Sequence, residues 1–166
     1  VWFPPRCALR RLLPQALYES NMSSSKIKKN IEEYGWHFLF VFDPKGEHVD
    51  FSYTIGLEES FNHPEIIVFG LKKDSAHGVL SAIVDDIKLG IVMEQNKKLP
   101  DVIGGNFEVL FKPIVGSAYE DYLGTAVKYY GKPFRAQVMF WPDKANRLPQ
   151  EKGCEVTIQD EALQIV

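Results

Sequence analysis

Apolar residues along the chain fall into five short runs typical of strands and three stripes with helical spacing. The predicted strands cover about 36–42, 49–55, 65–69, 107–111 and 134–141. The predicted helices cover about 25–34, 74–88 and 117–130. This order, with an early hairpin over 36–55, predicts an α+β fold with a mainly antiparallel sheet of about five strands and two to three packed helices.

Several local signals refine these boundaries. Residues 36–42 are apolar on both faces, which predicts a central strand that is covered on both sides. Asp74 is the expected N-cap of the second helix, and Ser117 with Glu120 fits a capping box for the third. Residues 94–105 are polar and contain proline and glycine, so we expect a long loop there.

The 166 residues suit a single domain, which we assign to 22–166. Residues 1–21 contain three prolines and three arginines and lack a regular pattern. Two interpretations of this extension stand side by side. Either Met22 is the natural start and 1–21 is an upstream or non-native addition, or 1–21 is an ordinary N-terminal arm.

The net charge of −3 and the pI near 5.8 argue against a nucleic-acid binder and suit a partner protein of basic character. Cys7 and Cys154 cannot form a disulfide framework, which favours a reducing compartment. No apolar run reaches the roughly 18 residues of a membrane span, and the N-terminus lacks a signal-peptide core. We therefore expect a cytoplasmic protein that does not insert into membranes.

Three residues are candidates for acid/base catalysis. His63 and Glu65 lie two apart at the entrance of a strand, where their side chains would point the same way, although both could simply bond to backbone groups. His77 lies in the first turn of the second helix, where the helix dipole favours a neutral imidazole; an ordinary surface histidine is the alternative. No histidine pair has helical zinc spacing, so we expect neither a metal nor another cofactor.

Four more residues are candidates for ligand binding: Tyr53, Thr54, Arg135 and Trp141. Thr54 could line a pocket on a sheet face or pair with a neighbouring strand. Arg135 could hold an anion or pair with a nearby acid. Trp141, if exposed, would mark a binding surface. No nucleophile elbow or phosphate-binding loop is present, so the assignment of an enzyme stays open and leans towards no.

An ordered set of short motifs resembles an uncharacterised bacterial family catalogued as domain of unknown function 4262. The resemblance covers about 31–154. The matching pieces are Tyr34-Gly35-Trp36-His37, 51–57, His63-Pro64-Glu65, Phe69-Gly70-Leu71, 129–136, 140–143 and Gly153-Cys154. The family name implies no established reaction.

Two classes of function follow. The first is a small acidic binding protein without catalysis, for example a toxin-neutralising immunity protein whose partner is a basic toxin domain. Its expected contact residues are Glu58, Glu59 and Glu94. The second is a small enzyme or ligand-binding domain with a polar pocket near Tyr53, His63 and Arg135.

Overall fold

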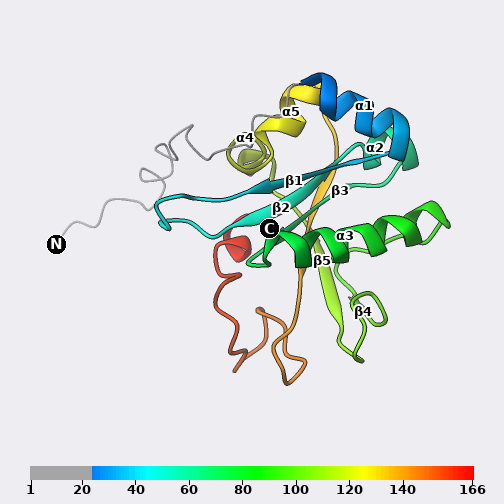
Figure 1. Ribbon diagram of the computed structural model, residues 1–166. Helices are drawn as coiled ribbons and strands as arrows, with labels where there is room; N and C mark the ends of the chain where they lie inside the picture. The colour runs from blue at the N-terminus through cyan, green and yellow to red at the C-terminus, as the bar shows by residue number, and fades with distance from the viewer. Residues whose placement is uncertain (1–23) are drawn as a thin grey trace.

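The computed structural model describes residues 24–166, which form a mixed sheet flanked by helices (Figure 1). The predicted extension 1–21 and Met22 lie outside these residues. The α+β class is confirmed. The sheet has six strands where about five were expected: β1 (His37–Val41), β2 (Phe51–Ile55), β3 (Glu65–Phe69), β4 (Lys98–Leu99), β5 (Val109–Pro113) and β6 (Ala136–Phe140).

The described residues contain five α-helices instead of two or three. They are α1 (Ser24–Tyr34), α2 (Leu57–Phe61), α3 (Lys73–Lys88), α4 (Tyr119–Tyr122) and α5 (Gly124–Tyr130). The third predicted helix is divided because Leu123 leaves the helical region, with φ −120° and ψ 26°.

Both predicted N-caps are wrong. Ser117 lies within a 3-10 turn, η2 (Gly116–Ala118), and no side chain caps α4. Lys72 occupies the N-cap position of α3 without a capping hydrogen bond from its side chain. Asp74 therefore lies inside the first turn, where an acidic side chain still interacts favourably with the helix dipole.

The strand order is β1-β2-β3-β6-β5-β4. The β1–β2 hairpin is present as predicted, with His37 opposite Ile55 and Val41 opposite Phe51. Four of the five pairings are antiparallel, and the pairing of β3 with β6 is parallel. A parallel pair requires a long crossover connection. Here the chain between β3 and β6 contains α3, β4, β5, α4 and α5.

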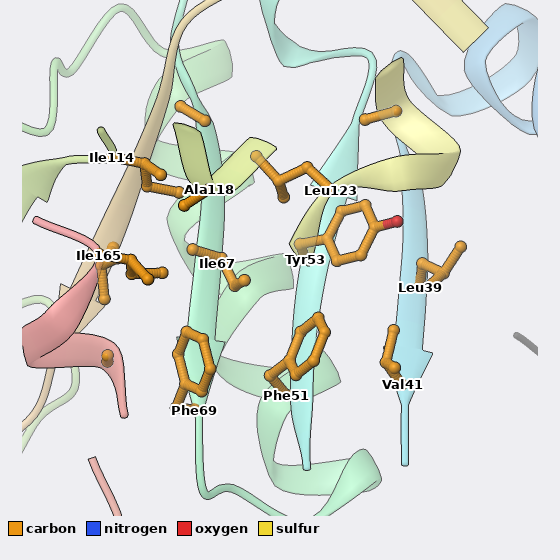
Figure 2. Close-up of a cluster of buried hydrophobic side chains, with 14 of the residues drawn as sticks. Leu39, Val41, Phe51, Tyr53, Ile67, Phe69, Ile114, Ala118, Leu123 and Ile165 are labelled. Atoms are coloured by element: carbon orange, nitrogen blue, oxygen red, sulfur yellow. The ribbon is translucent and has the colours of Figure 1, made fainter. Parts of the chain in front are cut away.

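Helices cover both faces of the sheet. α1, α4, α5 and the C-terminal turn η3 (Ala162–Gln164) pack on one face, and α3 packs on the other (Figure 1). Figure 2 shows part of the first face, with Phe51 and Tyr53 on one strand, Phe69 on the next, and Leu123 near Tyr53. The α3 face is built from side chains such as Leu80 and Ile83. Because β2, β3 and β6 are covered on both faces, all their residues are buried.

The prediction that the first strand is central is wrong, because β1 lies at the edge of the sheet. Its apolar pattern has another cause. Leu39 and Val41 join the core beneath α1, α4 and α5, while Phe38 packs on the α3 side. Apolar residues on both faces of a strand therefore indicate that both faces are covered. They do not indicate whether the strand is central or at the edge of the sheet.

Two phenylalanines should show this difference in stability. Phe69 is fully buried in β3, and Phe69→Ala should cost about 3–5 kcal/mol of unfolding free energy through lost burial and a cavity. Phe40 is only half-buried on the edge strand, so Phe40→Ala should cost less than half as much. Denaturant unfolding of both variants measures this, and equal losses would contradict an edge position for β1.

Candidate functional site

The predicted residues Thr54 and Glu65 meet in a buried cluster of hydrogen bonds. The Glu65 carboxylate, at the first residue of β3, is fully buried. Its Oε2 accepts a hydrogen bond from the Thr54 hydroxyl at 2.6 Å, and its Oε1 accepts one from the Tyr130 hydroxyl of α5. The backbone N–H groups of Gly56 and Glu58 also donate to Oε1, at 2.9 and 3.1 Å. Four donors thus surround one carboxylate.

The turn from β2 into α2 places the two backbone donors. Gly56 precedes α2 with φ 113°, in the left-handed region that favours glycine. A Cβ at this position would lie 2.9 Å from Ile31 and 3.0 Å from the Gly35 carbonyl oxygen, both at the end of α1. The close approach directs the first N–H groups of α2 towards Glu65, so the carboxylate caps this short helix from another strand.

Burial raises the pKa of Glu65 to about 7, although the four donors act in the opposite direction. Burial and the neighbouring Glu65 charge also raise the pKa of Tyr130. Every donor around Glu65 is a backbone or side-chain group of the fold itself, and the Glu65 side chain is not exposed. The arrangement therefore serves to join β2, β3, α2 and α5.

His63 is buried but does not share this cluster. Its Nδ1–H donates to the Pro64 carbonyl oxygen at 2.8 Å, and its Nε2 accepts from the N–H of Met93 at 3.2 Å. Burial lowers the pKa of His63. With both ring nitrogens occupied, His63 fastens the loop after α3 to the start of β3, and the structure does not bring it to Glu65.

The two acidic residues of α2 have different partners at the surface, and one of them, Glu58, contacts the predicted anion-binding arginine. Arg135 donates through Nε and Nη2 to the Glu58 carboxylate, with a shortest distance of 2.9 Å, and its Nη2 also donates to the Asn62 carbonyl oxygen. The Glu58 carboxylate raises the pKa of Arg135. Glu59 accepts a hydrogen bond from the Tyr129 hydroxyl at 2.8 Å.

The other predicted binding residues lie apart from these. Tyr53 is buried in the core of the sheet (Figure 2). Trp141 is half-buried, and its indole N–H donates to the Phe69 carbonyl oxygen at 2.9 Å. Glu94 is exposed and pairs with Lys97 at 3.1 Å. The predicted residues therefore do not converge on one cleft.

A groove of about 490 Å³ opens beside β1, between α1 and α3. Of the predicted residues, only His77 contributes to its walls. The lining consists of Lys26, Asn30, Tyr34, Trp36, His37, Phe38, His77, Ser81, Asp85 and Lys88.

His37 is the unusual residue of this groove. It is 2% exposed, and its Nδ1 lies 2.9 Å from the side-chain nitrogen of Asn30, which donates to it. Nε2 therefore carries the ring proton, yet this buried atom has no hydrogen-bond partner within residues 24–166. Burial, together with the charge of Lys26, lowers the pKa of His37 to about 4. His37 thus lines the groove as a neutral imidazole, and its buried Nε2–H has no acceptor within residues 24–166.

The remaining walls combine aromatic rings with positive charge. His77 stacks on Trp36 with ring centroids 6.2 Å apart, and it meets the Phe38 ring edge-on at 4.9 Å. Lys26 and Lys88 also line the groove, and the one carboxylate among the lining residues, Asp85, lies 3.8 Å from Lys88. The groove therefore carries a positive balance in a chain whose net charge is −3.

The same edge has unpaired backbone groups. The carbonyl oxygen of Asp50 accepts from the Gly70 N–H, so the even-numbered residues of β2 turn their peptide groups towards β3. The odd-numbered residues of β2 therefore pair with the odd-numbered residues of β1. The peptide groups of Phe38 and Phe40 consequently face away from the sheet, and no backbone partner for them lies within residues 24–166.

Sequence reasoning selected His77 but missed His37 and the other groove residues, because each looks ordinary alone. The available signal was the pair Trp36-His37 at the start of an otherwise apolar strand. Within residues 24–166, no three His, Cys, Asp or Glu side chains gather in a group that could hold a metal ion. No helix among these residues has the length and apolarity that crossing a membrane requires.

The Glu65 cluster predicts how stability depends on pH. The pKa of Glu65 is higher in the folded chain than its ordinary 4.5, so the folded chain binds more protons between pH 4.5 and about 7. Its contribution is complete below pH 4.5 and is lost as pH rises through 7, by up to about 3 kcal/mol. The neutral variant Glu65→Gln should remove this part of the pH dependence of the melting temperature.

The exposed Glu120→Gln variant is the matched control, since it removes a carboxylate that has little contact with the core. Thermal unfolding followed by circular dichroism from pH 4 to 8 compares the slopes. Parallel curves for wild type and Glu65→Gln would show that Glu65 does not titrate in this range.

The comparisons with known proteins agree with the motif set seen in the sequence. The family described as Domain of unknown function (DUF4262) matches residues 30–155, which include β1, the Glu65 cluster and most of the groove. Searches of curated proteins and of solved structures gave no significant match. Since the match spans more than half of the residues of the chain, the chain belongs to the family Domain of unknown function (DUF4262).

Proposed function

We propose that this chain is a binding protein that recognises an extended segment of a partner protein by adding it as a strand to the free edge of β1. The observation that carries the proposal is that the peptide groups of Phe38 and Phe40 face outward and have no backbone partner within residues 24–166. Unpaired edge groups are a template for another strand, and several recognition domains bind extended peptides in this way.

The edge lacks the features that usually prevent such pairing. Edge strands are commonly protected by lysine, proline or a bulge. Residues 36–42 contain no charged residue and no proline, and β1 pairs with β2 without interruption. Trp36, Phe38 and Phe40 alternate along one face of the edge and are only half-buried. An added strand would cover these rings with its own side chains.

Charge favours an acidic segment at this edge. Lys26 and Lys88 line the groove against a single aspartate. A second copy of the chain fits less well, because its 36–42 edge has no carboxylate to place near these lysines. The carboxylate that follows the edge, Asp43, already accepts from the N–H groups of the turn, including those of Lys45 and Glu47.

The partner class expected from the sequence, a basic toxin domain, would have to contact another surface. The acidic residues foreseen for that contact, Glu58 and Glu59, lie on α2 with Arg135 and Tyr129 as their partners. An immunity role remains a prediction about the identity of the partner. The binding mode proposed here concerns how an extended segment is held, whatever protein it belongs to.

A displayed library of random peptides selected on the folded protein tests the proposal. Phe40→Pro removes only an N–H that β1 does not use in the sheet, while Phe40→Val keeps that N–H and is the matched control for loss of the ring. Selected peptides should bind wild type and Phe40→Val. They should lose at least about tenfold in affinity for Phe40→Pro, the loss of about one hydrogen bond.

Amide hydrogen exchange gives a readout that does not depend on how Phe40→Pro folds. Peptide binding to wild type should slow exchange at Phe38 and Phe40, whose N–H groups face outward, and leave Leu39 nearly unchanged, because it is already paired with β2. Failure to select any peptide, or binding without added protection at Phe38 and Phe40, would contradict strand addition.

A further inference from the structure

The His37 end of the groove adds a chemical requirement to the proposed strand addition. His37 begins β1 and lies in the groove together with Lys26 and Asn30 of α1. Asn30 donates to Nδ1, so the proton of the ring is on Nε2, where it has no acceptor within residues 24–166. An unsatisfied buried donor is costly, and proteins rarely keep one without a ligand or other partner.

The unused donor lies next to a positive charge. Lys26 is close enough for its charge to act on the His37 ring, and it also lines the groove. Lys26 is exposed and has no ion-pair partner among the described residues. A neutral N–H donor beside an ammonium group suits a ligand group that only accepts hydrogen bonds and is negatively charged.

Resting on the proposed function, we infer that the strand added to β1 carries an aspartate or glutamate whose carboxylate pairs with Lys26 and accepts from His37 Nε2–H, which binding must first uncover because this atom is buried. The backbone groups of Phe38 and Phe40 bind the strand whatever its sequence, and the carboxylate determines which strand is bound. The aromatic wall of Trp36, Phe38 and His77 then packs against neighbouring side chains of the same strand.

The alternative acceptors are weaker candidates. A backbone carbonyl could accept from Nε2–H but would leave the Lys26 charge unused. A free inorganic anion could satisfy both groups but would not cover the half-buried rings of Trp36 and Phe38. A carboxylate on an extended segment would satisfy the Nε2–H donor and the Lys26 charge, and the rest of the segment would cover the half-buried rings.

The test compares pairs of selected peptides that differ only by Glu or Gln, or Asp or Asn, at each acidic position. One acidic position should dominate, and its amide replacement should weaken binding to wild type by about 10–100-fold, the range for a hydrogen bond to a charged group. His37→Phe, which keeps an aromatic ring but no N–H, should remove this preference. His37→Gln, which keeps an N–H, should restore part of it.

Lysine variants separate the local contact from general charge. Lys26→Ala should reduce the preference for the acidic peptide, whereas Lys28→Ala, an exposed lysine on α1 that does not line the groove, should not. Acidic and amide peptides that bind wild type equally would overturn the carboxylate assignment and leave strand addition standing. If Lys28→Ala reduced the preference for the acidic peptide as much as Lys26→Ala, the carboxylate assignment would also be overturned.

A probe that does not depend on strand addition distinguishes failure of the carboxylate assignment from failure of the strand-addition proposal. N-acetylglutamate amide, compared with N-acetylglutamine amide, should shift the NMR signals of the His37 ring in wild type more than those of His48, which lies outside the groove. Equal effects of the two compounds on His37 would count against the carboxylate site even if peptides pair with β1.

Discussion

The arrangement of the helices depends on one buried carboxylate. Burying an ionisable group is costly unless its hydrogen-bonding capacity is filled, and Glu65 meets that condition with donors from β2, α2 and α5. The same bonds hold the sharp turn at Gly56, which lies so close to the end of α1 that a Cβ there would clash with Ile31 and the Gly35 carbonyl oxygen. The position of α1, one wall of the groove, is therefore set through contacts that begin at Glu65.

Two features that folded proteins usually avoid occur together at the β1 edge. One is a strand edge without a charge or proline, and the other is a buried imidazole N–H that has no acceptor among the described residues 24–166. Each is unfavourable in isolation. Both would be relieved by a single ligand that supplies a strand and an acceptor, which is why we treat them as parts of one site.

The sequence predicted local elements well and their spatial neighbours poorly. Branched and aromatic runs located β1, β2 and β3, because side-chain alternation is a local property. The edge position of β1 and the parallel pairing of β3 with β6 depend on long-range contacts that no local pattern encodes. Four of the five pairings are antiparallel, so the expected character of the sheet was right in outline.

The candidate site shows the same limit. His63 and Glu65 were paired by their spacing, yet each side chain finds different partners, the loop at Met93 for one and Tyr130 for the other. Thr54 was noticed for its hydroxyl, and its partner Glu65 could be recognised only once β2 and β3 were aligned. The groove residues are distributed from Lys26 to Lys88 and meet only in the fold.

The parallel pairing of β3 with β6 has a consequence for synthesis of the chain. β1, β2 and β3 are contiguous and can pair as soon as they emerge, but β6 follows β3 by about 70 residues. During that interval the nascent sheet has two open borders, one at β1 and one at the apolar strand β3. α3 can shield a face of β3 but not its border, so this stage of translation is the one most exposed to aggregation until β6 docks.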